Sequence, residues 1–428
     1  MRKYCLIIHD EYKQNLISEI SKGSFKISLT SDIWSSQNNS DYLCVTAHYI
    51  DNNWILQKRI LSFIELEYQH TASKIAGYIM RTINEYKIEK FIFSITFDNA
   101  SANNSAIEIL KMQLEPMFSG NFFHVRCVCH ILNLCVKDGL KIIDPHLRRV
   151  RDGILFAKNS SIRRYEFKRY CKGMGKKYKK FISDVPHRWN STYAMLECAY
   201  DYKDVLTMYC NEHFPEIGLT TYDWDVSYII KEFLEIFNIA TNFFSGVYYP
   251  TTFMTIKQLY YISDIFSKYR HDPNFASIAA PMELKFKKYF EKIDPLPVLS
   301  MFLDPRFKID GTFCLIDSYD ENMGFDHSYY KDNYRCLLYE MYNEYNTKYG
   351  NRRASNLATN FENPSSSSND KSTAHLINMI KRKFASDASS SSSSSSTSSL
   401  HELNLFLNNN INDRLTPEEI NNFNIFSW

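Results

Sequence analysis

The sequence predicts an α/β protein in which a mixed five-stranded sheet is followed by a large all-helical region. Strand-like and helical runs alternate as far as Cys127, and from about residue 145 to residue 349 the apolar residues recur only at helical spacing. Tyr and Phe number 30 each whereas Gly and Pro number 12 each, which favours helices and large side chains over a turn-rich all-β fold.

The expected elements follow a βββαβαβ order after a helical stretch at residues 11–22. Turn residues Asp51 to Asn53 separate the second strand from the third, and Thr71 is a good N-cap for the first helix after the strands. The strand-like runs lie at residues 25–30, 42–50, 56–66, 91–97 and 122–127, with the second helix at 103–114.

This order of elements restricts the topology of the sheet. Three consecutive strands can form an antiparallel meander, and two strands that arrive through helices can then join it in parallel. The result is compatible with an RNase H-like core, although other mixed α/β sheets share it.

Length, charge and cysteine usage set outer limits on the class of protein. A chain of 428 residues holds two or three packed units, and its net charge of +2 gives no global bias towards nucleic acid. Ten scattered cysteines without a preceding signal peptide indicate reduced thiols in the cytosol or nucleus. No run of 18 apolar residues occurs, so we expect no membrane-spanning helix.

Composition divides the chain into five segments. Residues 1–24 form an N-terminal helical stub, residues 25–144 the first part of the α/β core, and residues 145–349 the helical region. Residues 350–399 are rich in Ser and Asn and cannot bury enough apolar surface to offset their chain entropy, so we expect a disordered linker. Apolar residues return in the last segment, residues 400–428.

Two aspartates stand at strand ends of the predicted sheet. Asp32 follows the first strand and Asp98 ends the fourth, and in a mixed sheet of this order these strands can lie side by side. Paired carboxylates suit Mg²⁺, and two such ions can activate a water and stabilise the leaving oxygen of a phosphodiester. The alternative is that each aspartate only caps a helix or completes a turn.

A basic, aromatic-rich stretch lies near the start of the helical region. Residues 146–188 contain 14 Lys or Arg against three Asp or Glu, with six Phe or Tyr among them. Cations neutralise phosphates and aromatics can stack on bases, so we expect DNA contact here, with a solvated helix face as the alternative. The cations chosen to test this are Arg163, Arg164, Lys168 and Arg169.

A cysteine–histidine segment occupies residues 124–140. Cys127, Cys129, His130 and Cys135 offer soft ligands, but residues one or two apart rarely converge on a tetrahedron and a second pair at zinc-finger spacing is missing. We therefore expect no zinc. His130 either faces the active site or the DNA, or is a hydrogen-bonded core histidine.

Four segments carry a resemblance to a known family. They read K-I-S-L-T-S-D-I-W-S-S at 26–36, T-F-D-N-A-S-A-N at 96–103, C-x-x-H at 127–130 and V-P-H-R-W-N-S-T-Y-A-M-L at 185–196. Together they resemble hAT-family DNA transposases, in particular the RICESLEEPER-like branch with zinc finger BED domains. L-D-P-R-F-K at 303–308 matches another segment of this family, which we interpret as structural.

The resemblance assigns roles to individual residues. It implies that Asp32 and Asp98 are the first two catalytic acids, which hold Mg²⁺ or Mn²⁺, and that residues 145–349 include an hAT-like RNase H-fold region. Arg188 and Trp189 would approach the active site, where the Trp can stack on a displaced base; His187 stands where the family usually has Thr. A buried Trp that anchors a helix is the alternative.

The same resemblance indicates what the sequence lacks. Residues 401–407 and 423–428 resemble the opening of the family's C-terminal dimerisation region, but no S-x-x-S-E segment with the third catalytic acid occurs. No C-x₂-C with a downstream His pair, as in a BED zinc finger, precedes Lys26. We therefore expect a chain truncated at both ends relative to the family.

These observations lead to one main hypothesis and two alternatives. We expect a nuclear, transposase-derived protein that binds DNA but is catalytically incomplete, with possible self-association and neither a membrane nor a small molecule as partner. The first alternative is an active cut-and-paste transposase subunit that uses Mg²⁺ or Mn²⁺ and obtains its third acid elsewhere. An unrelated two-aspartate nuclease is the second.

Overall fold

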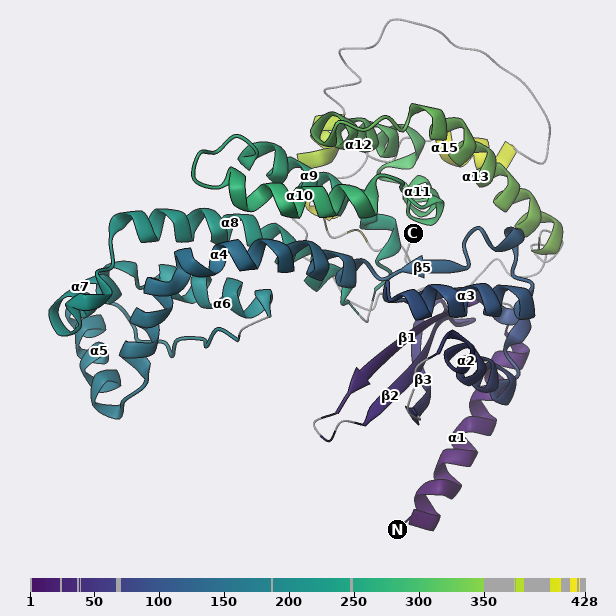
Figure 1. The fold of residues 1–428 in the computed structure, drawn as a ribbon. Helices are drawn as coiled ribbons and strands as arrows, with labels where there is room; N and C mark the ends of the chain where they lie inside the picture. Colours follow the sequence, from purple (N-terminus) through teal and green to yellow (C-terminus); the bar gives the residue numbers. More distant parts are fainter. Residues whose placement is uncertain are drawn as a thin grey trace, which may run out of the picture.

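A five-stranded mixed sheet forms the N-terminal part of the protein (Figure 1). The computed structural model describes residues 2–349 except 24, 37, 39, 67–70, 186–187 and 247–248. In the C-terminal part it describes residues 373, 375–380, 401–408, 416–421 and 423. No helix within these ranges is long and apolar enough to cross a membrane.

The sheet has the strand order β3-β2-β1-β4-β5, and the predicted topology is confirmed. The first three strands pair antiparallel, β4 joins β1 in parallel, and β5 joins β4 in parallel. The bounds are β1 Ile27–Ser35, β2 Asp41–Ile50, β3 Leu56–Leu66, β4 Ile92–Phe97 and β5 His124–Arg126. The sequence pattern had indicated that Asp32 follows the first strand. This was wrong, because β1 continues to Ser35 and Asp32 lies within it.

Helices α2 (Ala72–Tyr86) and α3 (Ser101–Leu114) cover one face of the sheet, and α1 (Arg2–Lys22) packs there only through its C-terminal turns and otherwise extends away (Figure 1). Thr71 caps α2 as predicted, because its hydroxyl accepts a hydrogen bond from the backbone N–H of Lys74. Side chains alternate between the two faces of a strand, so Ile27 and Leu29 are buried beneath these helices. Ser28, Thr30 and Asp32 consequently lie on the opposite face.

The helical region forms a second body with its own apolar core. In Figure 1, α4 to α8 extend away from the sheet as an arm, and α9 to α13 lie closer to it. The arm comprises α4 Val128–Lys158, α5 Ser161–Gly173, α6 Trp189–Tyr200, α7 Lys203–His213 and α8 Thr221–Phe244. The remaining helices are α9 Thr255–Tyr269, α10 Ala276–Phe290, α11 Pro295–Phe302, α12 Lys308–Met323 and α13 Ser328–Tyr349. Helix α4 runs through the boundary that composition suggested at residue 145.

The predicted linker lies mostly outside the described residues. Within it, Thr373 and residues 375–380 are helical, and Leu376 and Ile377 are buried against the helical core. Two short helices follow, α15 (His401–Asn408) and α16 (Pro417–Asn421).

The L-D-P-R-F-K segment anchors these C-terminal helices. Arg306 and Asp304 form a buried bidentate pair, with nitrogen–oxygen distances of 2.9 and 2.6 Å. Arg306 also donates to the carbonyl of Ile420 at 3.2 Å, and Lys308 Nζ donates to that of Phe406 at 2.7 Å. Both carbonyls lie in the last turns of α16 and α15, where helix carbonyls lack intrahelical partners. This agrees with the structural interpretation of residues 303–308.

Candidate functional site

Asp32 and Asp98 are neighbours on adjacent parallel strands. The register between β1 and β4 pairs Ser28 with Ser94 and Thr30 with Thr96. Continued by two residues, it sets Asp32 opposite Asp98, which directly follows the last residue of β4. Because successive side chains alternate, both carboxylates lie on the sheet face away from α2 and α3. The predicted adjacency of the two strands is confirmed.

Asp98 is held in a fixed orientation by the start of α3. Its Oδ1 accepts hydrogen bonds from the backbone N–H of Ala100 at 2.9 Å and from Nδ2 of Asn103 at 2.6 Å. Asn103 is buried, so its amide has little freedom to turn away. No residue in the described ranges bonds to Oδ2, which leaves this oxygen available to a ligand.

The surroundings of Asp32 disfavour the charged form of its carboxyl group. Desolvation by the surrounding protein raises the pKa of Asp32, and the nearby charge of Asp98 adds to this effect, while a backbone hydrogen bond from Ile33 and the proximity of His130 oppose it. The side chain keeps access to solvent, so the desolvation is partial. A pair of carboxylates that repel each other in this way fits a divalent cation, which removes the repulsion.

His130 and Cys127 join this edge of the sheet from the start of α4. Cys127 continues β5 beside β4, because its backbone N–H donates to the carbonyl of Phe97 at 2.8 Å. His130 lies in the first turn of α4, within electrostatic range of Asp32. The structure thus brings Asp32, Asp98, Cys127 and His130 to one edge, where the positive end of the α4 dipole also lies.

The other cysteines of this segment face different neighbours. Cys129 Sγ lies 3.7 Å from both the carbonyl of Thr241 and the hydroxyl of Ser245, against α8. Cys135 is buried in the helical core, where burial raises the pKa of its thiol to about 12. Across the described ranges, no three His, Cys, Asp or Glu side chains gather closely enough to hold a metal ion.

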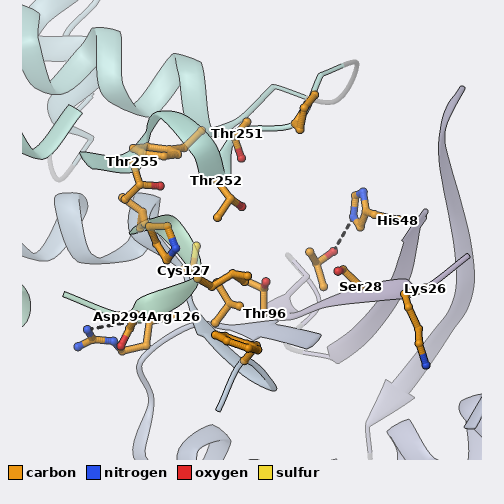
Figure 2. Close-up of a pocket in the computed structure, with 18 of the residues that line it drawn as sticks. Lys26, Ser28, His48, Thr96, Arg126, Cys127, Thr251, Thr252, Thr255 and Asp294 are labelled. Carbon is orange, nitrogen blue, oxygen red and sulfur yellow. Dashed lines mark hydrogen bonds and ion pairs between the residues drawn. The ribbon is translucent and has the colours of Figure 1, made fainter. Parts of the chain in front are cut away.

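A cavity of about 840 Å³ lies on the same sheet face, between the sheet and the helical body (Figure 2). Thr30 and Thr96 form part of its wall and each stands two residues before a carboxylate. A hydrogen bond of 3.1 Å joins Nε2 of His48, on β2, to the hydroxyl of Thr30. Desolvation lowers the pKa of this histidine. Thr251 and Thr255 face the sheet residues from the helical side (Figure 2). On this face of the sheet, Asp32 and Asp98 are therefore the next two side chains after Thr30 and Thr96 of the cavity wall.

Trp189 is buried and Arg188 is exposed. Trp189, 3% exposed, is the first residue of α6 and belongs to the helical core, which favours the interpretation of this Trp as a helix anchor. The preceding segment is tied down by Asp184, whose Oδ1 accepts from Ser191 and Thr192, both at 3.0 Å. Its Oδ2 accepts from Arg151 at 2.6 Å. Sequence reasoning missed Asp184, because nothing local distinguishes it from a solvated acid.

The basic cluster occupies α5, remote from the carboxylates. Arg163, Arg164, Lys168 and Arg169 are all exposed on this helix. Two of them lie over aromatic rings: Arg163 is 4.1 Å from the ring centre of Phe156, and Lys168 is 4.9 Å from that of Tyr178. Helix α4, with 31 residues and a length of about 46 Å, separates α5 from His130. The predicted DNA-contacting cations and the carboxylates therefore lie at opposite ends of α4 (Figure 1).

Comparisons with known proteins follow this division of the chain. Residues 30–121 match the ZBED1 RNase-like domain, residues 125–233 the ZBED1 RNase-like helical domain, and residues 252–345 the hAT-like transposase RNase-H fold. The first two matched ranges contain the two carboxylates and His130, respectively.

Similar proteins come from plants. An AC transposase of Zea mays is 33% identical over 318 residues, which cover 72% of this chain and 39% of that protein. The zinc finger BED domain-containing protein RICESLEEPER 2 of Oryza sativa subsp. japonica is 25% identical over 348 residues, which cover 79% of this chain and 48% of that protein. The zinc finger BED domain-containing protein DAYSLEEPER of Arabidopsis thaliana is 24% identical over 314 residues, which cover 71% of this chain and 45% of that protein. The chain therefore spans less than half the length of each of these relatives.

Proposed function

Because the chain belongs to the hAT transposase family, we propose that it is a transposase-derived DNA-binding protein whose carboxylate pair forms an incomplete catalytic metal site. The observation that carries this proposal is the placement of Asp32 and Asp98 on adjacent parallel strands, on one face and in register. Asp98 Oδ1 does accept a turn hydrogen bond from Ala100, but a turn role does not require a second carboxylate at the neighbouring position of β1.

The residues at this edge fit Mg²⁺ or Mn²⁺. Both ions prefer oxygen ligands, and Asp32 and Oδ2 of Asp98 would supply them, with Asn103 fixing the orientation of Asp98. Such an ion, when bound, supplies Lewis-acid activation of a water and of a phosphodiester oxygen. His130, in the first turn of α4, would contact the DNA backbone or the water beside Asp32.

Two carboxylates without a third acid leave the ion loosely held, and phosphodiester cleavage depends on fixed metal geometry. Within the described ranges, no third His, Cys, Asp or Glu joins the pair in a group that could hold a metal ion. A second function, that of a transposase subunit active in the nucleus, is favoured by the open Oδ2 of Asp98. A further acid from another segment or subunit would complete the site there.

DNA binding would come mainly from the arm. The exposed cations of α5 would contact phosphates, which gives affinity with little sequence preference. The length of α4 would then set the distance between the bound duplex and the carboxylates.

One experiment tests both parts of this proposal. The purified chain is mixed with duplex DNA in Mg²⁺ or Mn²⁺, and binding is followed by fluorescence anisotropy while strand integrity is followed on denaturing gels. We expect salt-sensitive binding with no nicked product. Nicking that Asp32→Asn abolishes would establish the second function instead, and absence of binding at low salt would overturn the proposal.

A further inference from the structure

Three aromatic side chains form a continuous surface on the sheet face beyond Asp32. Trp34 on β1 is paired with Tyr42 on β2, and Phe63 on β3 is paired with Cys44 and lies diagonally from Tyr42. The rings of Tyr42 and Phe63 are stacked, with centres 5.0 Å apart and planes 6° apart. The Trp34 ring lies 5.6 Å from that of Tyr42 and 6.1 Å from that of Phe63. We refer to these three residues as the aromatic cluster.

The cluster is open to solvent. Trp34 is 48% exposed and Phe63 is 55% exposed, so the described part of the chain leaves about half of each side chain uncovered. Cross-strand aromatic pairs do stabilise sheets, but that role is served by mutual contact and does not require exposed rings. Large aromatic side chains gathered in solvent indicate a binding surface.

The cluster adjoins the carboxylate pair. Trp34 follows Asp32 by two residues on the same face of β1, a separation of about 6.6 Å along the strand. The last pair between β1 and β4 is Thr30 with Thr96, and β4 ends at Phe97, whereas β1 continues to Ser35. The flank of Trp34 on the Asp98 side therefore has no neighbouring strand. A chain that crosses the carboxylates can pass directly over Trp34.

We propose that the aromatic cluster is a stacking site for unpaired nucleobases of a DNA strand whose backbone lies at the Asp32–Asp98 pair. This inference rests on the proposed function. Every base has a π-face, so exposed aromatic rings bind single strands with little sequence preference. The distance of about 6.6 Å corresponds to roughly two nucleotides along a stacked strand. Because Trp189 is buried, the exposed Trp34 is better placed to receive such a base.

Charge at the cluster favours stacking over phosphate attraction as the source of affinity. Glu65 is paired with Tyr42 across β2 and β3 and is exposed on the same face. An acid therefore stands beside the rings, and two more, Asp32 and Asp98, lie next to them on this face. Single-strand binding at the cluster should therefore persist at salt concentrations that weaken duplex binding by α5.

The test compares Trp34→Ala, Trp34→Phe and Trp54→Ala in binding an oligothymidylate of about 12 nucleotides. Trp54, 61% exposed in the turn between β2 and β3, is a matched control because the turn lies at the end of that hairpin away from Trp34 and Tyr42. Affinity is measured by anisotropy and by quenching of tryptophan fluorescence. Trp34→Ala should weaken binding about tenfold, Trp34→Phe less, and Trp54→Ala not at all.

Two controls keep the result interpretable. Thermal denaturation shows whether each variant is folded, and Trp34→Phe retains a ring in case Trp34→Ala does not fold. Duplex binding and Mn²⁺ binding are measured on the same samples. Loss of these two activities would count against the proposed function, whereas oligothymidylate binding tests the aromatic cluster alone. Unchanged oligothymidylate affinity in folded Trp34→Ala, or an equal loss in Trp54→Ala, would overturn the inference.

Discussion

The side-chain amide of Asn103 donates a 2.6 Å hydrogen bond to Oδ1 of Asp98. This hydrogen bond joins α3 to the end of β4 and restrains the orientation of the Asp98 carboxylate. Asn103 therefore positions the carboxylate without contacting a ligand itself.

Removal of this amide should weaken cation binding. We expect Asn103→Ala to lower the affinity for Mn²⁺ about tenfold, because loss of a residue that orients a metal ligand typically costs 10- to 100-fold. Isothermal titration calorimetry measures the change. Asn104→Ala is the control, since Asn104 is the exposed neighbour on the same helix and should bind Mn²⁺ as the unaltered chain does. Equal affinities in the two variants would show that Asp98 needs no support from α3.

The cations of α5 should determine the salt dependence of duplex binding. Replacement of Arg163, Arg164, Lys168 and Arg169 by Ala should reduce the slope of log affinity against log salt by up to about 3.6, or about 0.9 for each phosphate that is no longer neutralised. Substitution of the three arginines by Lys preserves the charge and should preserve the slope. If the Ala variant keeps the original slope, α5 is only a solvated helix.

Trp189 should contribute to stability. We expect Trp189→Ala to lower the free energy of unfolding by about 3–5 kcal/mol, because a large buried side chain is replaced by a cavity. Trp189→Phe should cost less and leave DNA affinity unchanged. Urea denaturation of both variants provides the measurement. A folded Trp189→Ala variant of unaltered stability but reduced DNA affinity would instead support base stacking by this Trp.

Arg306 should secure the C-terminal helices. Arg306→Ala leaves the buried carboxylate of Asp304 without its partner, and removal of one member of a buried pair typically costs about 3–5 kcal/mol. It also removes the donor to Ile420, so limited proteolysis should cut within residues 401–421 earlier than in the unaltered chain. The double variant Asp304→Leu/Arg306→Met should recover stability but not protection from the protease. Equal protection in all three proteins would exclude the anchoring role.

The sheet could be predicted from the sequence because strand alternation and helical crossovers restrict its topology. The adjacency of Asp32 and Asp98 followed from the same reasoning because β1 and β4 are neighbours in this strand order, although Asp32 lies within β1 and not at its end. Hydrogen bonds between segments that are distant in the sequence were not predictable in this way. Asp184 bonds Arg151 across 33 residues and Arg306 reaches Ile420 across 114, so no local pattern reveals either pair. Burial of Trp189 likewise depends on helices that are distant in the sequence.

The most direct test of the carboxylate pair is Mn²⁺ binding followed by electron paramagnetic resonance, which reads the ion itself and does not require cleavage. We predict one weakly bound Mn²⁺ per chain, lost equally in Asp32→Asn and Asp98→Asn. Both variants should remain folded, because Asn is similar in size and removes mutual repulsion. Mn²⁺ binding that is unchanged in either variant would contradict the assignment of Asp32 and Asp98 as a shared metal site.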